Sequence, residues 1–204
     1  SIYKHFKDKY YIVVDIVNDC ESNNDLEYKD ADEYVDYATD VFEQELAKAL
    51  NLTRVSAPLF VFPSTGLNDE LSGSERRVSF GIKNVSEFVE IVQSLAKWKR
   101  NALSVYNFDA EYGLYTDMNA IRPFEELDNI HSLYVDQWDW ERIIKKEDRN
   151  LDYLKEVVRK IYKALLITEK VVEKAYPILS ISLPEDIAFI STTELEAMYP
   201  NLTS

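Results

Sequence analysis

Apolar residues recur at spacings of three and four along two long segments of the chain. In the first segment, residues 32–50, the repeated positions are Val35, Ala38, Phe42, Leu46 and Ala49. In the second segment the repeat runs without interruption from Leu151 to Ala175, and Pro177 follows it. Because this period places one apolar stripe on an α-helix, we predict amphipathic helices over residues 32–50 and 151–175. We predict a third helix over residues 94–103 from the same pattern.

Short runs of β-branched and aromatic residues predict the strands. They cover residues 10–17, 54–62, 77–83, 88–92, 115–121, 131–140 and 187–190. Pro58 lies inside the second run and indicates an edge or interface position, because proline donates no ladder hydrogen bond. Polar segments predict loops at 18–30 and 64–73, and Ser191 with Glu194 has the spacing of a capping box that opens a last short helix. Since strands and helices are mixed without a regular alternation, we predict an α+β fold with an antiparallel sheet flanked by helices.

Glycine and cysteine usage exclude several kinds of site. The 204 residues include four glycines, and none follows Gly113. The chain therefore has no glycine-rich dinucleotide motif and no P-loop for phosphates. One cysteine and two histidines argue against a disulfide framework and against metal sites built from these residues. The length fits one large domain or two small ones, and it is sufficient to bury a core without disulfides or metals.

The net charge of the chain is −14, and residues 1–40 contribute half of it through four lysines and eleven acidic residues. We interpret residues 1–31 as an acidic extension that leads into a domain over residues 32–204. A protein this acidic is poorly suited to bind the phosphates of nucleic acids. No apolar run reaches the roughly 18 residues of a membrane span, and no signal peptide opens the sequence. We therefore expect a cytoplasmic protein that contacts neither membrane nor nucleic acid.

The strand predicted at residues 131–140 carries polar groups on both of its faces. One face would present Tyr134, Asp136, Trp138 and Trp140, and the other His131, Leu133, Val135, Gln137 and Asp139. Gln137 and Asp139 beside Val135 are unusual for a face that packs against a core. Either the strand lies at an edge and its polar end is solvated, or these side chains belong to a site. The periodicity alone does not choose between the two.

Three charged residues stand out by their positions. Lys99 interrupts the apolar stripe of its predicted helix, and a lysine buried there needs a partner for its charge. The alternative, which the pattern alone favours, is that its stem packs while its amine reaches water. Arg122 precedes Pro123 at a strand end, where a guanidinium can bind a phosphate or a carboxylate through two hydrogen bonds. Asp69 lies in a turn-rich loop that has no specific meaning by itself.

Several segments together resemble one enzyme family. They are Asn-Asp-Glu-Leu-Ser-Gly at 68–73, Ser-Leu-Ala-Lys-Trp-Lys-Arg at 94–100, Gly-Leu-Tyr-Thr at 113–116, Ala-Ile-Arg-Pro at 120–123, His-Ser-Leu-Tyr-Val-Asp-Gln-Trp-Asp-Trp-Glu at 131–141 and Tyr-Pro-Asn-Leu at 199–202. The resemblance is to aspartate–ammonia ligases, the ammonia-dependent asparagine synthetases, and it extends over about residues 34–204. The segment with two tryptophans is highly specific to this family.

The family is similar to the catalytic core of class II aminoacyl-tRNA synthetases, above all aspartyl-tRNA synthetase. The resemblance therefore implies an antiparallel sheet flanked by helices, working as a homodimer. The helix at 32–50 and the strand with Pro58 look like the class II dimer motif. Arg122, an acidic loop, His131 and Asp139 look like the second class II motif, whose arginine binds the α-phosphate of ATP.

The reaction that the resemblance implies joins L-aspartate to ammonia with ATP, through an aspartyl-adenylate, and releases asparagine, AMP and pyrophosphate. Three residues are then the expected catalytic ones: Lys99 pairs with a substrate carboxylate, Arg122 binds the α-phosphate, and Asp69 takes the substrate ammonium. The expected aspartate-binding residues are Asp69, Ser94, Lys99, Gln137 and Asp139. The expected ATP-binding residues are Arg122, His131 and Ser132, with the last two near the adenine and Mg²⁺ bridging the phosphates.

The sequence also departs from the family pattern. Gln93 and Ser191 replace histidines that are usual there, and Ser64 with Thr65 replaces a glycine–aspartate pair. The chain stops at Ser204, where the family continues with more strands and a glycine-rich third class II motif, so we expect half of the ATP site to be missing. The alternative hypothesis is therefore a non-catalytic relative that binds aspartate, asparagine or a partner. A third hypothesis, tRNA aminoacylation, is disfavoured by the negative charge.

Overall fold

The computed structural model describes residues 28–69, 76–124, 126, 133–179 and 182–200. The predicted strand at 10–17 and the predicted adenine contacts His131 and Ser132 lie outside these residues. The helices are α3 (Tyr28–Leu50), α4 (Ala96–Val105), α5 (Leu151–Ala175) and α6 (Thr192–Met198), with the short 3₁₀ turns η1 (Pro63–Thr65) and η2 (Lys146–Asp148). The strands are β1 (Leu52–Arg54), β2 (Phe60–Val61), β3 (Ser79–Gly81), β4 (Phe88–Ile91), β5 (Gly113–Ile121) and β6 (Tyr134–Arg142).

The strands of the described residues form two small sheets. In the first sheet the order is β1-β5-β6, with β1 parallel to β5 and β5 antiparallel to β6. In the second sheet the order is β2-β4-β3, and both pairings are antiparallel. The predicted α+β class is confirmed, and the sheets are antiparallel apart from the pairing of β1 with β5.

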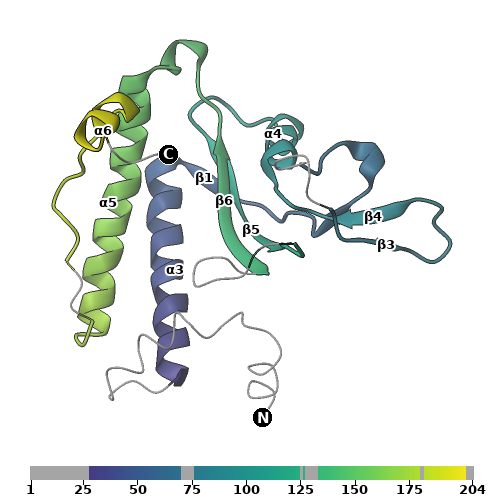
Figure 1. Cartoon of the computed structure of the whole chain (residues 1–204), viewed down its shortest axis with the longest axis horizontal. Coiled ribbons are helices and arrows are strands. Elements are labelled where there is room, and N and C mark those ends of the chain that lie inside the picture. Colours follow the sequence, from purple (N-terminus) through teal and green to yellow (C-terminus); the bar gives the residue numbers. More distant parts are fainter. Residues whose placement is uncertain (1–27, 70–75, 125, 127–132, 180–181, 201–204) are drawn as a thin grey trace.

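The two long helices cover one face of the first sheet. Figure 1 shows α3 and α5 side by side, next to the strands β1, β5 and β6. The buried cluster beneath them joins Leu46 and Leu50 of α3 to Leu52 of β1 and Ala164 of α5. Aromatic side chains of the sheet pack against this cluster, among them Tyr115, Trp138 and Trp140. Burial of the predicted helix stripes therefore holds these two helices on the sheet.

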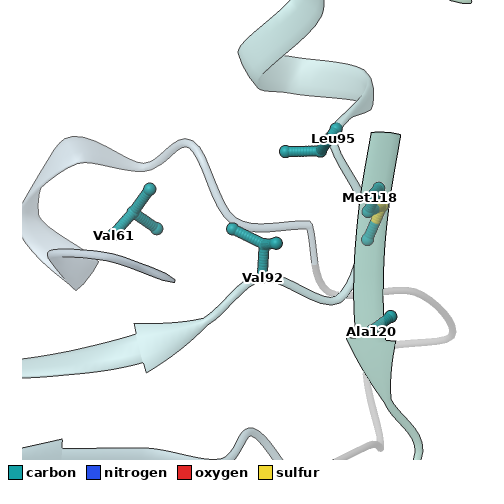
Figure 2. Close-up of a cluster of buried hydrophobic side chains, with 5 residues drawn as sticks. All are labelled: Val61, Val92, Leu95, Met118 and Ala120. Carbon is teal, nitrogen blue, oxygen red and sulfur yellow. The ribbon is translucent and has the colours of Figure 1, made fainter. Parts of the chain in front are cut away.

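The opposite face of the first sheet packs against the start of α4 and against the second sheet. Figure 2 shows Met118 and Ala120 on β5, near Val92, Leu95 and the more distant Val61. All five side chains are buried. Because Val92 and Leu95 lie on either side of the turn between β4 and α4, this core fixes the position of that turn over β5.

Several predicted boundaries need correction. The helix α3 begins at Tyr28, so residues 28–30 are helical and not part of a loop. The strand predicted at 54–62 is two strands, since the chain leaves β1 and joins the second sheet as β2. Pro58 lies in the break between them and cannot donate a ladder hydrogen bond. The strand predicted at 187–190 was wrong, because Phe189 packs against cationic side chains of α5 instead of pairing in a sheet.

The predicted capping box is confirmed at the start of α6. The Ser191 hydroxyl accepts from the backbone N–H of Glu194 at 3.2 Å, and the Glu194 carboxylate accepts from the backbone N–H of Ser191 at 2.7 Å. Two hydrogen bonds to the carboxylate lower the pKa of the Glu194 carboxyl: the larger cause is the Ser191 hydroxyl, which also donates to Oε2 at 2.7 Å, and the second is the Ser191 backbone N–H. Across the described ranges, no helix combines the length and the apolarity that crossing a membrane requires.

Candidate functional site

Lys99 is a buried cation on α4 that has partners in the protein. Its side chain is 5% exposed, so the alternative that the helix pattern alone favoured, an amine that reaches water, was wrong. The ammonium donates to Oδ1 of Asp139 at 2.5 Å and to the backbone carbonyl of Trp140 at 3.0 Å. A second carboxylate, that of Glu141, lies 3.8 Å away. The helix α4 and the strand β6 thus bring together two of the predicted substrate-binding residues.

The register of β5 and β6 explains the mixed pattern of the β6 sequence. Asp139 is opposite Thr116 and Gln137 is opposite Met118. Directly paired residues share a face of the sheet, and Met118 packs beneath the start of α4. Gln137 and Asp139 therefore lie on the face toward α4, whereas Trp138 packs on the face toward α3. The polar face that looked unusual in the sequence is the face that meets Lys99.

Arg122 extends the same face beyond the end of β5. Its backbone N–H donates to the carbonyl of Leu133 at 2.7 Å, so the pairing of the two strands continues for one residue. Since side chains alternate along a strand, Arg122 follows Met118 and Ala120 on the side toward α4. Its Nη1 is buried and has no hydrogen-bond partner among the described residues.

Asp69 reaches the site from the loop after η1. Its Oδ1 lies 3.6 Å from the ammonium of Lys97 on α4. Its Oδ2 is buried without a hydrogen-bond partner in the described part of the chain. Ser94, in the turn before α4, accepts from the backbone N–H of Ala96 at 3.2 Å. Asp69 and Ser94 thus both contact the first turn of α4, Asp69 through Lys97 and Ser94 through Ala96.

The unpartnered polar atoms concentrate around this site. Within the described residues, the buried side-chain atoms without a hydrogen-bond partner are Asp69 Oδ2, Gln93 Oε1, Arg122 Nη1 and Trp138 Nε1. The first three belong to residues around the start of α4 and the end of β5. Buried polar groups normally have partners, because leaving one unpaired costs about 1–3 kcal/mol. Their concentration here is the observation on which we base the candidate site.

Gln93 is the residue that the predicted site omitted. Its side chain is buried, and its backbone N–H donates to Oδ1 of Asn68 at 2.8 Å. The one signal in the sequence was the replacement of a usual histidine at this position. That signal indicated a departure from the family and did not indicate a role.

Tyr115 lies on the opposite face of β5 and is not suited to proton transfer. Burial, together with a hydrogen bond to Glu43, raises the pKa of its hydroxyl to about 12. The phenol therefore stays protonated near neutral pH, where a general base needs a pKa close to the working pH. The ring packs 4.9 Å from that of Trp138, measured between centroids, so its role is in the core.

Neither a cluster of metal ligands among the described residues nor the surface cavity marks the polar face between α4 and the β5–β6 pair. Among the described residues, no group of three histidine, cysteine, aspartate or glutamate side chains could hold a metal ion. A surface cavity of about 690 Å³ lies between the end of β6 and the start of α5, lined in part by Trp140, Arg142, Leu151 and Leu154. Lys99, Arg122 and the other described site residues do not line it. We therefore place the candidate site by its unpartnered atoms and not by this cavity.

Comparisons with known proteins agree on one family. The family model described as aspartate–ammonia ligase matches residues 29–204. A curated relative named aspartate–ammonia ligase, from Clostridium tetani (strain Massachusetts / E88), is 60% identical over 185 residues, which are 90% of this chain and 54% of the relative. One from Clostridium perfringens (strain SM101 / Type A) is 62% identical over 166 residues, 81% of this chain and 49% of the relative. The chain thus spans about half the length of the curated relatives that it matches.

A solved structure supports the fold. Asparaginyl-tRNA synthetase from Entamoeba histolytica, in complex with asparaginyl-adenylate, superposes with a TM-score of 0.51 at 11% sequence identity. The match covers 82% of this chain and 35% of that chain. At this level of identity the likeness shows the fold alone, and it agrees with the class II synthetase core that the sequence resemblance implies.

Proposed function

Because the chain belongs to the aspartate–ammonia ligase family, we propose that the whole protein joins ammonia to the side-chain carboxylate of L-aspartate. ATP is the second substrate, and the products are L-asparagine, AMP and pyrophosphate. The observation that carries this proposal is the polar face between α4 and the β5–β6 pair. It holds the buried Lys99 paired with the half-buried Asp139, and three residues with buried atoms that have no partner among the described residues. A zwitterionic substrate and a phosphate would complete these groups.

In the first step, an oxygen of the aspartate β-carboxylate attacks the α-phosphorus of ATP, and the bond from that phosphorus to pyrophosphate breaks. Negative charge builds up on the α-phosphate during this displacement. We assign Arg122 to that charge, because its Nη1 is buried and has no partner among the described residues. A preorganised guanidinium in a dry site stabilises such charge more than water does.

Lys99 keeps the aspartate in place. An ammonium has three N–H donors, and Asp139 and the carbonyl of Trp140 accept two of them. We propose that the third donates to a carboxylate of the substrate. We assign Gln137 and Asp139, which share a face of β6, and Ser94, before α4, to the aspartate-binding site, and Asp69 to the substrate ammonium.

In the second step, the nitrogen of ammonia attacks the carbonyl carbon of the aspartyl-adenylate. The bond from that carbon to the AMP oxygen breaks, and the nitrogen loses a proton. This step needs little covalent chemistry from the protein, since the adenylate is already activated and positioning supplies much of the rate. His131 and Ser132 remain our proposed adenine contacts. Mg²⁺ is proposed as the ion that ATP carries on its phosphates.

The oligomeric state, the location and the domain boundaries of the protein are proposals as well. We propose a homodimer in the cytoplasm, with α3 and the following strands at the dimer interface, as in the class II motif that they resemble. We also propose that residues 1–31 are an extension and that residues 32–204 are the N-terminal part of the catalytic domain. Sedimentation velocity of the full-length protein tests the dimer, because a mass of one chain would contradict it.

The test of the reaction uses the full-length protein with L-aspartate, ATP, Mg²⁺ and ammonium chloride. We expect AMP, pyrophosphate and asparagine in equal amounts. Aspartate labelled with ¹⁸O in its β-carboxylate should transfer one labelled oxygen to AMP, because that oxygen becomes bonded to the α-phosphorus. Release of ADP, or AMP without label, would contradict the adenylate pathway.

The same preparation distinguishes the non-catalytic alternative. If aspartate raises the melting temperature without ATP, and no AMP forms with all substrates present, the protein is a binding relative. If AMP forms, the ligase proposal stands. Omitting ammonium chloride should stop the release of asparagine, which controls for glutamine or another nitrogen donor in the preparation.

A further inference from the structure

Asn68 is a buried carboxamide that ties the Asp69 loop to the turn before α4. It is 5% exposed. Its Oδ1 accepts from the backbone N–H of Gln93 at 2.8 Å, and its Nδ2 donates to the carbonyl of Ile91 at 3.1 Å. The same Nδ2 lies 3.3 Å from Oε2 of Glu90. One side chain thus bonds to three of the four residues from Glu90 to Gln93, along β4 and the turn that follows it.

The partners of Asn68 are themselves held in place. Glu90 accepts from Arg77 at 2.9 Å, and both of these side chains are largely buried. Ile91 lies within the sheet, paired with Phe60 of β2. Asn68 therefore anchors its loop to a rigid strand and not to another loop. Such support is what a binding group needs to keep a fixed geometry.

The two residues on either side of this anchor carry matching unpartnered atoms. Asp69 follows Asn68 directly in the chain, and Gln93 is bonded to Asn68 through its backbone. Asp69 Oδ2 and Gln93 Oε1 are both buried acceptors without a donor among the described residues. One is a carboxylate and the other an amide oxygen, and a cation with several N–H donors satisfies acceptors of both kinds.

We propose that Asn68 is a positioning residue that sets Asp69 and Gln93 as the two acceptors for the α-ammonium of the substrate. This inference rests on the proposed function, in which Asp69 already binds that ammonium, and it adds Gln93 as a second acceptor. It also gives a physical role to the residue that replaces the usual histidine. A glutamine presents an acceptor without competing as a second cation.

Binding of the α-ammonium can be measured separately from the chemical steps. The α-ammonium does not react in either step, so its contacts have equal strength in the bound substrate and in the transition state. Loss of such contacts raises KM and leaves kcat unchanged. A residue that merely stabilised the fold would instead lower the amount of active protein, without changing the preference among ligands.

The test compares Asn68→Ala and Gln93→Leu with the full-length wild-type protein. The matched control is Asn101→Ala, an exposed position on α4. We expect KM for aspartate to rise by about tenfold or more in both test variants, as the loss of a hydrogen bond to a charged group predicts. KM for ATP and kcat should change by less than about threefold, and the control should behave as the wild type.

Succinate, which has both carboxylates of aspartate and lacks the ammonium, provides the decisive ligand. Binding is measured as the rise in melting temperature, which needs no turnover. The wild type should bind aspartate more tightly than succinate, and both test variants should lose that preference while binding succinate as before. Equal losses for the two ligands, or an unchanged preference, would overturn the proposal. If Asn68→Ala does not fold, Gln93→Leu decides it, because that variant keeps the backbone N–H bonded to Asn68.

The two proposals fail in different ways. A wild type that forms no AMP contradicts the ligase reaction, yet the comparison of aspartate with succinate still tests the ammonium acceptors. A wild type that forms AMP, with variants whose aspartate KM is unchanged, contradicts only the role of Asn68 and Gln93.

Discussion

The ammonium of Lys99 lies 2.5 Å from Oδ1 of Asp139, and the two partners differ sharply in their exposure to water. The lysine side chain is 5% exposed and the aspartate side chain 29% exposed. Removing the aspartate leaves a buried cation, whereas removing the lysine leaves a carboxylate that water can reach. The pair is therefore asymmetric in what each partner contributes to stability.

The asymmetry predicts an order of stability among apolar variants. We expect Asp139→Leu to lower the free energy of unfolding by about 2–4 kcal/mol, because it leaves the Lys99 ammonium without its anionic hydrogen-bond acceptor. Lys99→Met should cost about 1 kcal/mol, since the remaining carboxylate can be hydrated. The double variant should be more stable than Asp139→Leu alone. Denaturant unfolding of all three proteins checks the order, and a double variant with the sum of both losses would contradict it.

Lys99→Met also separates folding from activity. If the third N–H of Lys99 binds a substrate carboxylate, its loss should lower kcat/KM for AMP formation by at least about 100-fold. Circular dichroism should show a folded protein. The matched control is Lys163→Met at an exposed position of α5, which should retain activity within about twofold. Wild-type activity in Lys99→Met would reject the assignment of this lysine.

Gly113 marks the closest approach of backbones in the first sheet. A Cβ at this position would lie 2.3 Å from the carbonyl oxygen of Glu141 and 2.9 Å from Cα of Arg142. Because both neighbours are backbone atoms of β6, Gly113→Ala should cost at least about 3 kcal/mol of stability. Thermal melting measures this loss.

Gly66→Ala is the comparison for the same substitution. No atom lies within 4 Å of a Cβ at Gly66, and only its φ of +65° opposes a side chain. We expect a loss of about 1 kcal/mol there. Equal melting temperatures for the two alanine variants would show that the strands can separate to accept the extra carbon.

Tyr115 predicts how stability changes at high pH. Burial and the bond to Glu43 raise the pKa of this phenol to about 12 in the folded protein, against about 10 in an unfolded chain. The folded state therefore holds this proton more tightly, and the resulting stability is complete below pH 10. It is lost as pH rises from about 10 to 12, by on the order of 2 kcal/mol. Across this window the stability advantage of the wild type over Tyr115→Phe should shrink by that amount, and a constant difference would contradict the shift.

Local periodicity predicted the helices better than the strands. The helix α5 runs over Leu151–Ala175 as predicted, because an uninterrupted stripe and a following proline define both ends within the segment itself. The strands β1 and β2 were predicted as one, since a run of β-branched residues does not reveal that its two ends pair with different sheets. Strand pairing depends on residues far away in the chain, and no local pattern carries that information.

In the candidate site, too, the sequence indicated features of local pattern but not contacts between distant residues. The sequence indicated Lys99 as a cation in an apolar stripe and Asp139 as an acid on an apolar strand face, and it left open whether each was solvated. It did not indicate Asn68 or Gln93 as part of a site. The roles that we propose for them rest on hydrogen bonds between segments about 25 residues apart in the chain, and such bonds produce no periodic pattern in the sequence.

By itself, the sequence determined the amphipathic helices, the α+β class and the family, because periodicity and motifs are properties of neighbouring residues. Only the tertiary structure decided that Lys99 is buried and that its partner is Asp139. The physical reason is that an apolar stripe indicates which face of a helix is buried, but it does not indicate which element packs against that face. That depends on the packing of α4 over the β5–β6 pair, which sets the 2.5 Å contact between residues 40 positions apart.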